Sequence, residues 1–266
     1  MNHLLCRWAR LSLLLLFVFG ALGTAFAGEK NVPPVRDPKD YHPNPYFMKL
    51  IDNFPTLIER KVDWTMRKYL NNPQTLVLSF QPIDAVETKR GRYARIFVKV
   101  GRGSADNLVV DDAEFEFHDV LLDINKLIGE DKIETVTVKS INMNVKLTEA
   151  DLNSFIQAKS KKIKVDNPKA ELKKGTITVS GSTKYSFMKV KFWATGNFSV
   201  HEAREIYFYA RKVKVNGMTM PRGFVGSLVK QINPILNLDK FPFQLNLQEI
   251  RIEDGLMLFT SSRAGN

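Results

Sequence analysis

Residues 241–259 read FPFQLNLQEIRIEDGLMLF, and this stretch decides the class of the fold. Apolar residues occupy alternate positions over 241–247, which is the two-residue period of a strand with one buried face. The Asp254-Gly255 dipeptide is typical of a tight hairpin turn. Residues 250–252 and 256–259 are therefore predicted to pair as antiparallel strands.

The apolar positions change parity within this stretch. They are odd-numbered as far as Leu247 and even-numbered at Ile250 and Ile252. A bulge, or a strand that passes from one face of a strongly bent sheet to the other, produces such a change. Because several other predicted strands show it too, the pattern favours a curved antiparallel sheet.

The same two-residue period recurs along most of the chain. It predicts half-buried strands at residues 76–81, 96–100, 113–118, 135–147, 175–180, 185–195, 205–215 and 243–252. Gly101–Asn107 is interpreted as the turn between the second and third of these strands.

Three segments have the three- and four-residue period of an amphipathic helix instead. The first runs from Tyr46 to about Asn72, and Pro55 is expected to divide it. A short helix is predicted to begin at Thr148-Glu149-Ala150-Asp151, which resembles a capping box, and another near Pro221. Residues 120–128 fit a strand and a helix equally well.

The first 27 residues have the pattern of a cleavable secretory signal. Arg7 and Arg10 precede the apolar run Leu11–Phe19, and Ala25-Phe26-Ala27 is the motif that a signal peptidase accepts. The apolar run is shorter than the ~20 residues of a membrane-spanning helix, so an uncleaved anchor is the less favoured alternative. We expect export to the periplasm or the cell surface, with Gly28 as the new N-terminus.

The remainder of the chain is predicted to form a tether and one domain. Five of the twelve prolines fall within residues 31–45, so residues 28–45 are interpreted as an extended Pro-rich tether and residues 46–262 as a single domain. The only cysteine is Cys6, inside the predicted signal. The domain is therefore expected to contain no disulfide, thiolate metal site or cysteine nucleophile.

The chain is strongly basic, with a net charge of +11 that falls to +9 on loss of Arg7 and Arg10. An exported basic protein meets anionic headgroups more readily than nucleic acid, so the charge favours a membrane surface as partner. The simpler alternative is that dispersed lysines keep the domain soluble. The lysines predicted to contact headgroups or the membrane are Lys159, Lys161, Lys162, Lys173 and Lys174.

Few residues point to catalysis. The sequence has neither an H-E-x-x-H helix nor a G-x-S-x-G elbow. Glu114, Glu116 and His118 share one strand face and are a conceivable metal site, but an ordinary solvated face explains them more simply. We therefore assign no catalytic residue, no metal and no cofactor, and an enzyme that uses the Glu114 and His118 face stays a third hypothesis.

Two segments resemble a known family. From Leu236 through the Asp254-Gly255 turn to Leu256, the chain resembles the closing signature of the LmeA-like bacterial phospholipid-binding family, which ends in an apolar-Pro-Phe-x-Leu strand, a strand, a D-G turn and a final strand. Val145–Leu152 is similar to the family's strand that runs into a T-E-x-D-L helix start. The resemblance covers roughly residues 46–261.

The resemblance implies an α+β fold related to the tubular lipid-binding (TULIP/BPI-like) folds. In this TULIP-like fold, a strongly curved antiparallel β-sheet is wrapped on a long N-terminal helix, with two short helices and an apolar groove or tunnel for acyl chains. The apolar faces of the helix and strands are then expected to line the cavity, with two methionines near its mouth. The predicted lining residues are Leu50, Phe54, Ile58, Val62, Met66, Met218, Met220, Phe224, Leu228, Phe243, Leu245 and Leu247.

By this likeness the protein is expected to be an exported phospholipid-binding or lipid-carrier protein of the bacterial cell envelope, and not an enzyme. It would hold acyl chains in the cavity with basic residues near the headgroups, and act as a monomer on phospholipids and anionic membranes, with no nucleic acid as partner. The alternative is an envelope structural or assembly factor that binds a protein or polysaccharide. A filled interior would favour that alternative, because it has no room for acyl chains.

Overall fold

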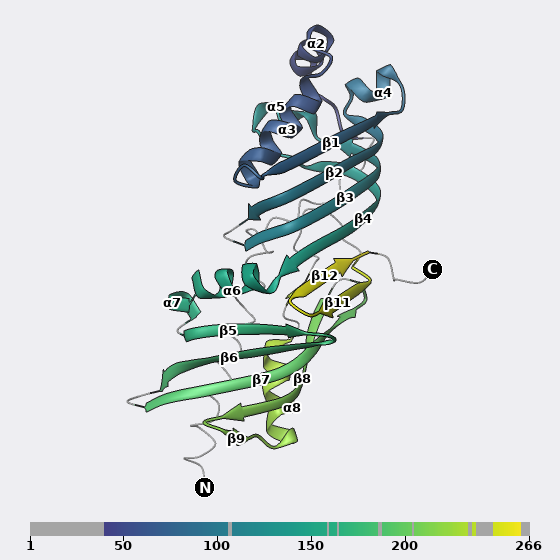
Figure 1. Cartoon of the computed structure of the whole chain (residues 1–266). Helices are drawn as coiled ribbons and strands as arrows, with labels where there is room; N and C mark the ends of the chain where they lie inside the picture. Colours follow the sequence, from purple (N-terminus) through teal and green to yellow (C-terminus); the bar gives the residue numbers. More distant parts are fainter. Residues whose placement is uncertain are drawn as a thin grey trace.

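The computed structural model of the chain describes residues 40–105, 108–158, 160–163, 165–185, 188–203, 205–233, 236–237 and 247–261. Within this part, the strands form two open antiparallel sheets that follow one another along the long axis of the molecule (Figure 1). The structure is therefore of the α+β class, as the resemblance implies.

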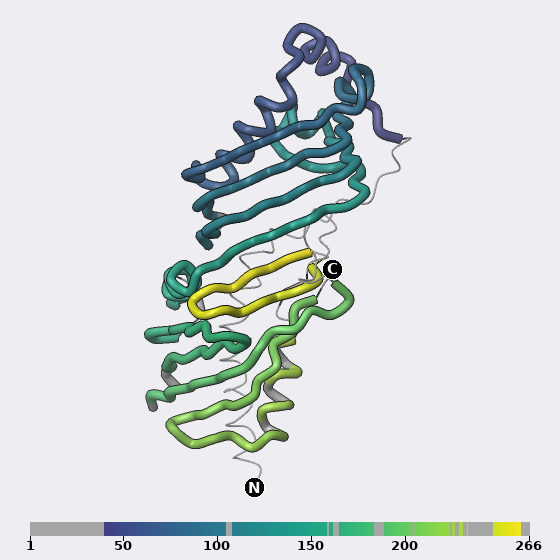
Figure 2. Tube along the Cα trace, turned by 45° about the vertical axis from the view of Figure 1, so that its right-hand side comes forward, coloured from purple at the N-terminus to yellow at the C-terminus, as the bar shows by residue number. Residues whose placement is uncertain are grey.

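Sheet A contains the first four strands and the C-terminal hairpin. Its order is β1 (Thr75–Pro82), β2 (Arg92–Ala105), β3 (Leu108–Leu122), β4 (Thr135–Thr148), β12 (Leu256–Thr260) and β11 (Glu249–Glu253). The predicted hairpin at Asp254-Gly255 is confirmed, because Glu253 pairs with Leu256. Figure 2 shows this hairpin between the rest of sheet A and sheet B.

Sheet B contains the middle of the chain. Its order is β10 (Leu236–Asn237), β8 (Glu205–Val215), β7 (Met188–His201), β6 (Thr176–Tyr185) and β5 (Asp166–Lys173), and β9 (Met218–Thr219) pairs with β8. The prediction of a single curved sheet is thus corrected to two sheets. The chain leaves sheet A through α6 (Glu149–Ala158) and α7 (Ser160–Ile163), and the final hairpin returns to pair with β4.

The N-terminal helical segment is two helices instead of one long helix. Helix α2 (Pro45–Asn53) begins where the Asn44 side chain accepts a hydrogen bond from the backbone N–H of Tyr46, and α3 (Leu57–Tyr69) follows the break at Pro55. The break is the one expected from proline, whose ring clashes with the preceding helical turn. Asn71 and Asn72 adopt positive φ angles of 53° and 54° just beyond the end of α3.

The ambiguous segment 120–128 contains the end of a strand and the start of a helix. Strand β3 ends at Leu122, and the Asp123 side chain accepts a hydrogen bond from the backbone N–H of Lys126 at 3.1 Å, which caps α5 (Ile124–Gly129). The described chain also contains α4 (Ala85–Lys89) and α8 (Arg222–Ile232), and α8 begins after Pro221 as predicted.

Strand β5 was not predicted. Its residues Pro168, Ala170 and Leu172 are buried and alternate with exposed side chains, which is a regular strand period. The lysines between the buried positions gave this segment the composition of a solvated turn. The high lysine content of the segment therefore hid the alternation of buried and exposed residues that is typical of a strand.

Several strands are interrupted by a residue with a positive φ angle or by a shift in the register of the ladder. In β3 the apolar parity is odd at Phe117 and even at Val120, and between them Asp119 has a φ of 45°. The ladders also shift register between Gln81 and Pro82 and between Thr195 and Gly196. These irregularities account for parity changes of the kind seen in the sequence.

Two large apolar clusters fill the described part of the molecule, and a third, small one joins Tyr41, Leu121 and Val136. One large cluster lies under sheet A and is covered by α2, α3 and α5. The other lies under sheet B, is covered by α6 and α8, and also includes Leu108, Leu147, Ile252 and Met257 from strands of sheet A. Helix α6 contacts both β3 and β5, so it lies between the two halves. Its buried face is Leu152, Phe155 and Ile156, as predicted from the sequence.

Candidate functional site

The inner face of sheet A is apolar across its first four strands. The register places apolar side chains in two adjacent rows: Phe80, Ile96, Phe117 and Ile141 in one, and Leu78, Val98, Phe115 and Met143 in the next. Ile96 and Val98, on the second strand, are each 4% exposed, whereas the phenylalanines of β1 and β3 stay half-buried. The face therefore keeps part of its apolar surface in contact with solvent.

The two apolar clusters differ in how completely they are sealed. Among the described residues, the cluster under sheet A contains 13 buried and 16 partly buried hydrophobic residues, whereas the cluster under sheet B contains 22 and 7. A close-packed core leaves few side chains half-exposed. Among the described residues, the apolar cluster of sheet A is thus the less completely sealed of the two.

Helix α3 covers one part of this open face. Ile58 and Val62 are buried against the sheet, and the Tyr93 hydroxyl donates a hydrogen bond of 3.0 Å to Oε1 of Glu59. Burial, assisted by the Glu59 carboxylate, raises the pKa of the Tyr93 phenol, so that it stays protonated as the donor. This contact fixes α3 to β2 and sets the boundary of the open surface.

The predicted lining residues of the N-terminal helices fall into three environments. Ile58 and Val62 are buried, and Leu50 and Met66 are half-buried. Phe54 is 56% exposed because it occupies the break between α2 and α3, where no helical face directs it inward. The structure thus places three of these five side chains, Ile58, Val62 and Met66, in the apolar cluster under sheet A.

Of the remaining predicted lining residues, the three that the structure describes, Met218, Met220 and Leu247, do not lie on this face. Leu247 is buried in the cluster under sheet B, as is Met220, while Met218 is 63% exposed on β9. Phe243 and Leu245 lie outside the described residues, and the side chains of Phe224 and Leu228 are not described either.

Sequence analysis missed the part that β3 and β4 play in this face. Phe115 and Phe117 have ring centroids 6.5 Å apart, and Met143 lies beside Phe115 across the β3–β4 ladder. Their alternation was recognised as that of half-buried strands. Which strands would lie under the N-terminal helices depended on the sheet order, which the period does not reveal.

The outer face of sheet A carries paired charges. Lys99 Nζ lies 2.7 Å from Glu114 Oε1 directly across the β2–β3 ladder, Lys146 lies 3.2 Å from Asp112 across β3–β4, and Arg95 pairs with Glu116. Burial raises the pKa of the Glu116 carboxyl, but the Arg95 guanidinium outweighs it and holds that pKa below its usual range. Each carboxylate is thus matched by a cation.

These pairings bear on the conceivable metal site at Glu114, Glu116 and His118. Both carboxylates are engaged by basic side chains, and His118 Nε2 lies 3.7 Å from Glu116. The described residues contain no group of three or more His, Cys, Asp and Glu side chains placed to hold a metal ion. In the same part of the chain, no helix has the length and apolar character needed to cross a membrane.

The lysines predicted to contact headgroups are only partly described. Lys159 lies outside the described residues and the side chain of Lys162 is not described, while Lys161 is exposed on α7. Lys173 and Lys174 are exposed at the β5–β6 turn, where Lys173 lies 3.7 Å from Glu171.

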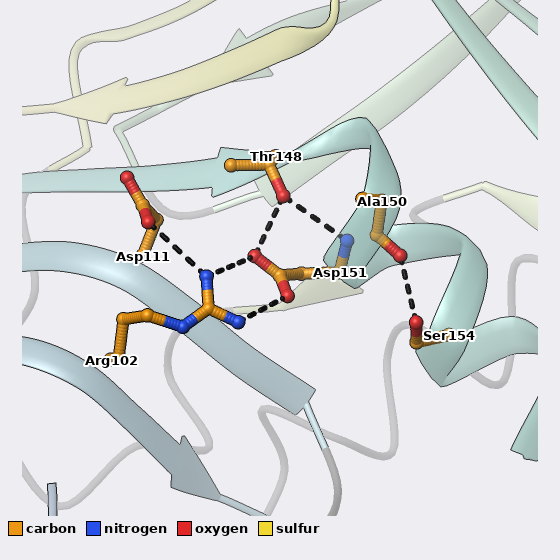
Figure 3. A network of polar contacts seen from close by, with 6 residues as sticks. All are labelled: Arg102, Asp111, Thr148, Ala150, Asp151 and Ser154. Atoms are coloured by element: carbon orange, nitrogen blue, oxygen red, sulfur yellow. Dashed lines mark hydrogen bonds and ion pairs between the residues drawn. The ribbon is translucent and has the colours of Figure 1, made fainter. Parts of the chain in front are cut away.

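The Thr148–Asp151 segment joins the two sheets at the start of α6. The Thr148 hydroxyl donates to Asp151 Oδ2 at 2.6 Å and accepts from the Asp151 backbone N–H at 3.1 Å, which caps the helix (Figure 3). Arg102, from the end of β2, lies 3.0 Å from Asp151 Oδ1 and 3.3 Å from Asp111. The carboxylate of Asp151 therefore connects the helix start to sheet A.

The same helix start is bound to sheet B and to the final hairpin. Glu149 Oε2 accepts a hydrogen bond from the backbone N–H of Leu172 at 2.7 Å, and the Glu149 backbone N–H donates to the carbonyl of Gly255 at 2.8 Å. Asp254 in turn accepts from the backbone N–H of Lys174 at 3.0 Å. The T-E-x-D-L and D-G motifs thus meet in space, and their polar residues hold the junction of the sheets.

No match to a curated protein or to a solved structure was found. The model of the LmeA-like phospholipid-binding family matches residues 54–262, which is most of the chain and includes both junction motifs and the inner face of sheet A. The chain belongs to the LmeA-like phospholipid-binding family.

Proposed function

We propose that this protein is an exported phospholipid-binding protein of the bacterial cell envelope, which holds acyl chains against the inner face of sheet A and carries lipid without chemical change. The observation that supports it is the incompletely sealed apolar cluster, with 16 partly buried hydrophobic residues in a chain of a phospholipid-binding family. The predicted secretory signal at residues 1–27 supports the export part of the proposal.

The physical basis is the burial of methylene groups. Each CH₂ transferred from water to an apolar environment contributes ~0.8 kcal/mol, so even a few methylenes seated on Phe115, Phe117 and Met143 give useful affinity. Aromatic and thioether side chains adapt to chains of different shape. A fully sealed core such as that of sheet B would have to open before it could accept the same group.

Lipid retention by matched variants tests the proposal. Phe115→Glu places a charge on the half-buried inner face, whereas Val77→Glu places the same charge on the outer side of β1, where Val77 is 47% exposed. Native mass spectrometry and lipid extraction of the purified proteins should find phospholipid with the wild type and the Val77 variant, and much less with the Phe115 variant. Thermal unfolding of each variant establishes that it is folded.

Two results would contradict the proposal. One is a folded wild-type protein that carries no lipid and takes none from vesicles. The other is equal lipid content in the Phe115 and Val77 variants. The first result would favour the alternative role, an envelope assembly factor, for which the sealed cluster of 22 buried residues under sheet B provides a rigid frame.

A further inference from the structure

The outer face of sheet B carries a cluster of cations around one tryptophan. Trp193 on β7 lies opposite Lys214 on β8 and Ser180 on β6, and Ser180 lies opposite Lys169 on β5. Lys191 is two residues before Trp193, and Lys212 lies opposite Thr195, two residues after it. We call Lys169, Lys189, Lys191, Lys212 and Lys214, with Trp193, the basic face.

These cations share one side of the sheet because of the strand period. On β7 the neighbours Val190, Phe192 and Ala194 are buried in the apolar cluster, so Lys189, Lys191 and Trp193 must point the other way. The face extends across four strands, β5 to β8, which is about 15 Å at the usual strand spacing.

Among the residues that the structure describes, the lysines of the basic face have no acidic partner. Within the described part of the chain, none of the five has a carboxylate oxygen within 4.0 Å, whereas sheet A pairs Lys99, Lys146 and Arg95 across its ladders. Strands β5–β9 contain three acidic residues, Asp166, Glu171 and Glu205. An unpaired cluster of like charges raises the energy of the free protein, and an external anion relieves it.

Trp193 gives the face an amphipathic centre. Lys214 Nζ lies 5.5 Å from the centroid of the Trp193 ring, and hydroxyl side chains of Ser180, Thr178 and Thr195 separate the cations. Tryptophan beside lysines is the composition found at the level of lipid headgroups, where the indole ring is partly apolar and its N–H can donate. Hydroxyl groups add donors for phosphate oxygens.

We propose that the basic face docks the protein on the surface of an anionic phospholipid bilayer. The proposal rests on the proposed lipid-binding function for the identity of the anion, since a lipid-binding protein must reach the membrane that holds its ligand. The face is a broad sheet surface with no described helix over it, and it lies on the opposite side of sheet B from α8. Sheet A would then remain free to hold the acyl chains.

Vesicle binding tests the docking. The purified protein is titrated with vesicles of phosphatidylcholine that contain phosphatidylglycerol and with vesicles of phosphatidylcholine alone, at low and high salt. The wild type should prefer the anionic vesicles and lose affinity as salt rises, because exposed charges are screened over ~10 Å at 0.1 M. Each suitably placed cation contributes about fivefold, so the triple change of Lys191, Lys212 and Lys214 to Gln should weaken binding on the order of 100-fold.

A charge-matched control distinguishes an effect of the basic face from an effect of the protein's net charge. Changing Lys49, Arg60 and Lys139 to Gln removes the same three charges from exposed positions in the sheet A half, and should leave vesicle binding nearly unchanged. Equal weakening by the two triple variants would overturn the proposal. Salt-insensitive binding of the wild type, or equal binding to both kinds of vesicle, would do the same without depending on how any variant folds.

Tryptophan fluorescence locates the contact. In a Trp8→Phe background, Trp64→Phe leaves Trp193, whose emission should shift to the blue on anionic vesicles, and Trp193→Phe leaves Trp64, whose emission should not. An unshifted Trp193 would contradict docking through this face. Binding to a soluble acidic polymer but not to vesicles would assign the face to an acidic macromolecule and overturn the bilayer proposal. Lipid retention, measured separately, reports whether the sheet A function fails.

Discussion

Sheet A and sheet B are built from the same antiparallel strand period but differ on both of their faces. Sheet A has a half-open apolar inner face and an outer face on which Lys99, Lys146 and Arg95 are matched by carboxylates. Sheet B has a sealed inner face and, among the described residues, an outer cluster of five lysines without a carboxylate partner. An open core and an unpaired charged surface both cost stability. The less stable face of sheet A is its inner, apolar face, and its outer face is ordinary. The less stable face of sheet B is its outer, charged face, and its inner face is ordinary.

This distribution indicates a division of work along the chain. The half with the open apolar face is suited to the acyl part of a phospholipid, and the half with the basic face is suited to the headgroups of a bilayer. The junction at Thr148, Asp151 and Asp254 holds the halves together through hydrogen bonds to both sheets. The T-E-x-D-L and D-G motifs recognised in the sequence lie at this junction.

The largest expected difference between the halves is the cost of removing a core aromatic ring. Phe208 is 1% exposed under sheet B, so Phe208→Ala should destabilise the protein by about 3–5 kcal/mol through lost burial and a closed cavity. Phe117→Ala on the half-open face leaves no closed cavity and should cost roughly half as much. Chemical denaturation measures both values. Equal losses would mean that the sheet A cluster is as tightly sealed as that of sheet B.

The next largest expected difference between the halves is the cost of adding a Cβ atom at a glycine that lies close to neighbouring atoms. A Cβ at Gly196, where the β7–β8 register shifts, would lie 2.3 Å from the carbonyl oxygen of Tyr209 and 2.5 Å from the Phe208 ring, whereas a Cβ at Gly101 would meet Thr75 at 3.2 Å. Gly196→Ala should therefore cost on the order of 1–3 kcal/mol, as overpacking does. Gly101→Ala should cost clearly less in the same denaturation experiment. The reverse order would show that the bulge at Gly196 relaxes freely.

The sequence predicted local features well because periods and turn residues act locally. The hairpin at Asp254-Gly255, the helix beginning at Glu149 and the strand Glu205–Val215 all follow from such signals. The division into two sheets did not, because it depends on which strand the final hairpin joins. Pairing of β12 with β4, across more than a hundred residues of sequence, leaves no mark in either strand's own period.

For the apolar face of sheet A and the basic face of sheet B, too, the sequence predicts local features but not which strands lie side by side. Ile58 and Val62 were predicted to be interior from helical spacing alone, and they are buried. The basic face combines Lys169, Lys191 and Lys212 from three strands, and only the register shows that they share one face. Lysine density along the chain is a feature of sequence neighbours, whereas a sheet surface is made by neighbours across strands.

A smaller effect is expected at the junction between the halves. Thr148→Ala removes the hydroxyl that caps α6, and should destabilise the protein by ~1 kcal/mol. Ser154→Ala is the control in the same helix, because the exposed Ser154 hydroxyl only donates to the carbonyl of Ala150 and its loss should be nearly neutral. Thermal unfolding compares the two. A neutral Thr148 variant would mean that Arg102 alone holds Asp151 in place.

The smallest effect concerns pH and separates the outer faces of the two sheets. On sheet A, although burial raises the pKa of Glu116, the Arg95 guanidinium lowers it below the ordinary value of 4.5. A carboxylate whose pKa is depressed by folding stabilises the folded state above its unfolded pKa, and this contribution is lost as the pH falls through the lower, folded value. The wild type should therefore lose stability below about pH 4.5 in part through Glu116, and Glu116→Gln should make the unfolding free energy less dependent on pH in that range.

At neutral pH the same variant should cost only ~0.2–1 kcal/mol, as cross-strand charge pairs do. Glu171→Gln on sheet B is the control at neutral pH, because its partner Lys173 is 67% exposed at a distance of 3.7 Å, and the change should cost less than Glu116→Gln. If Glu171→Gln costs as much as Glu116→Gln, the matched charges of sheet A are no stronger than the sparse ones of sheet B, and the contrast between the two outer faces is one of number alone.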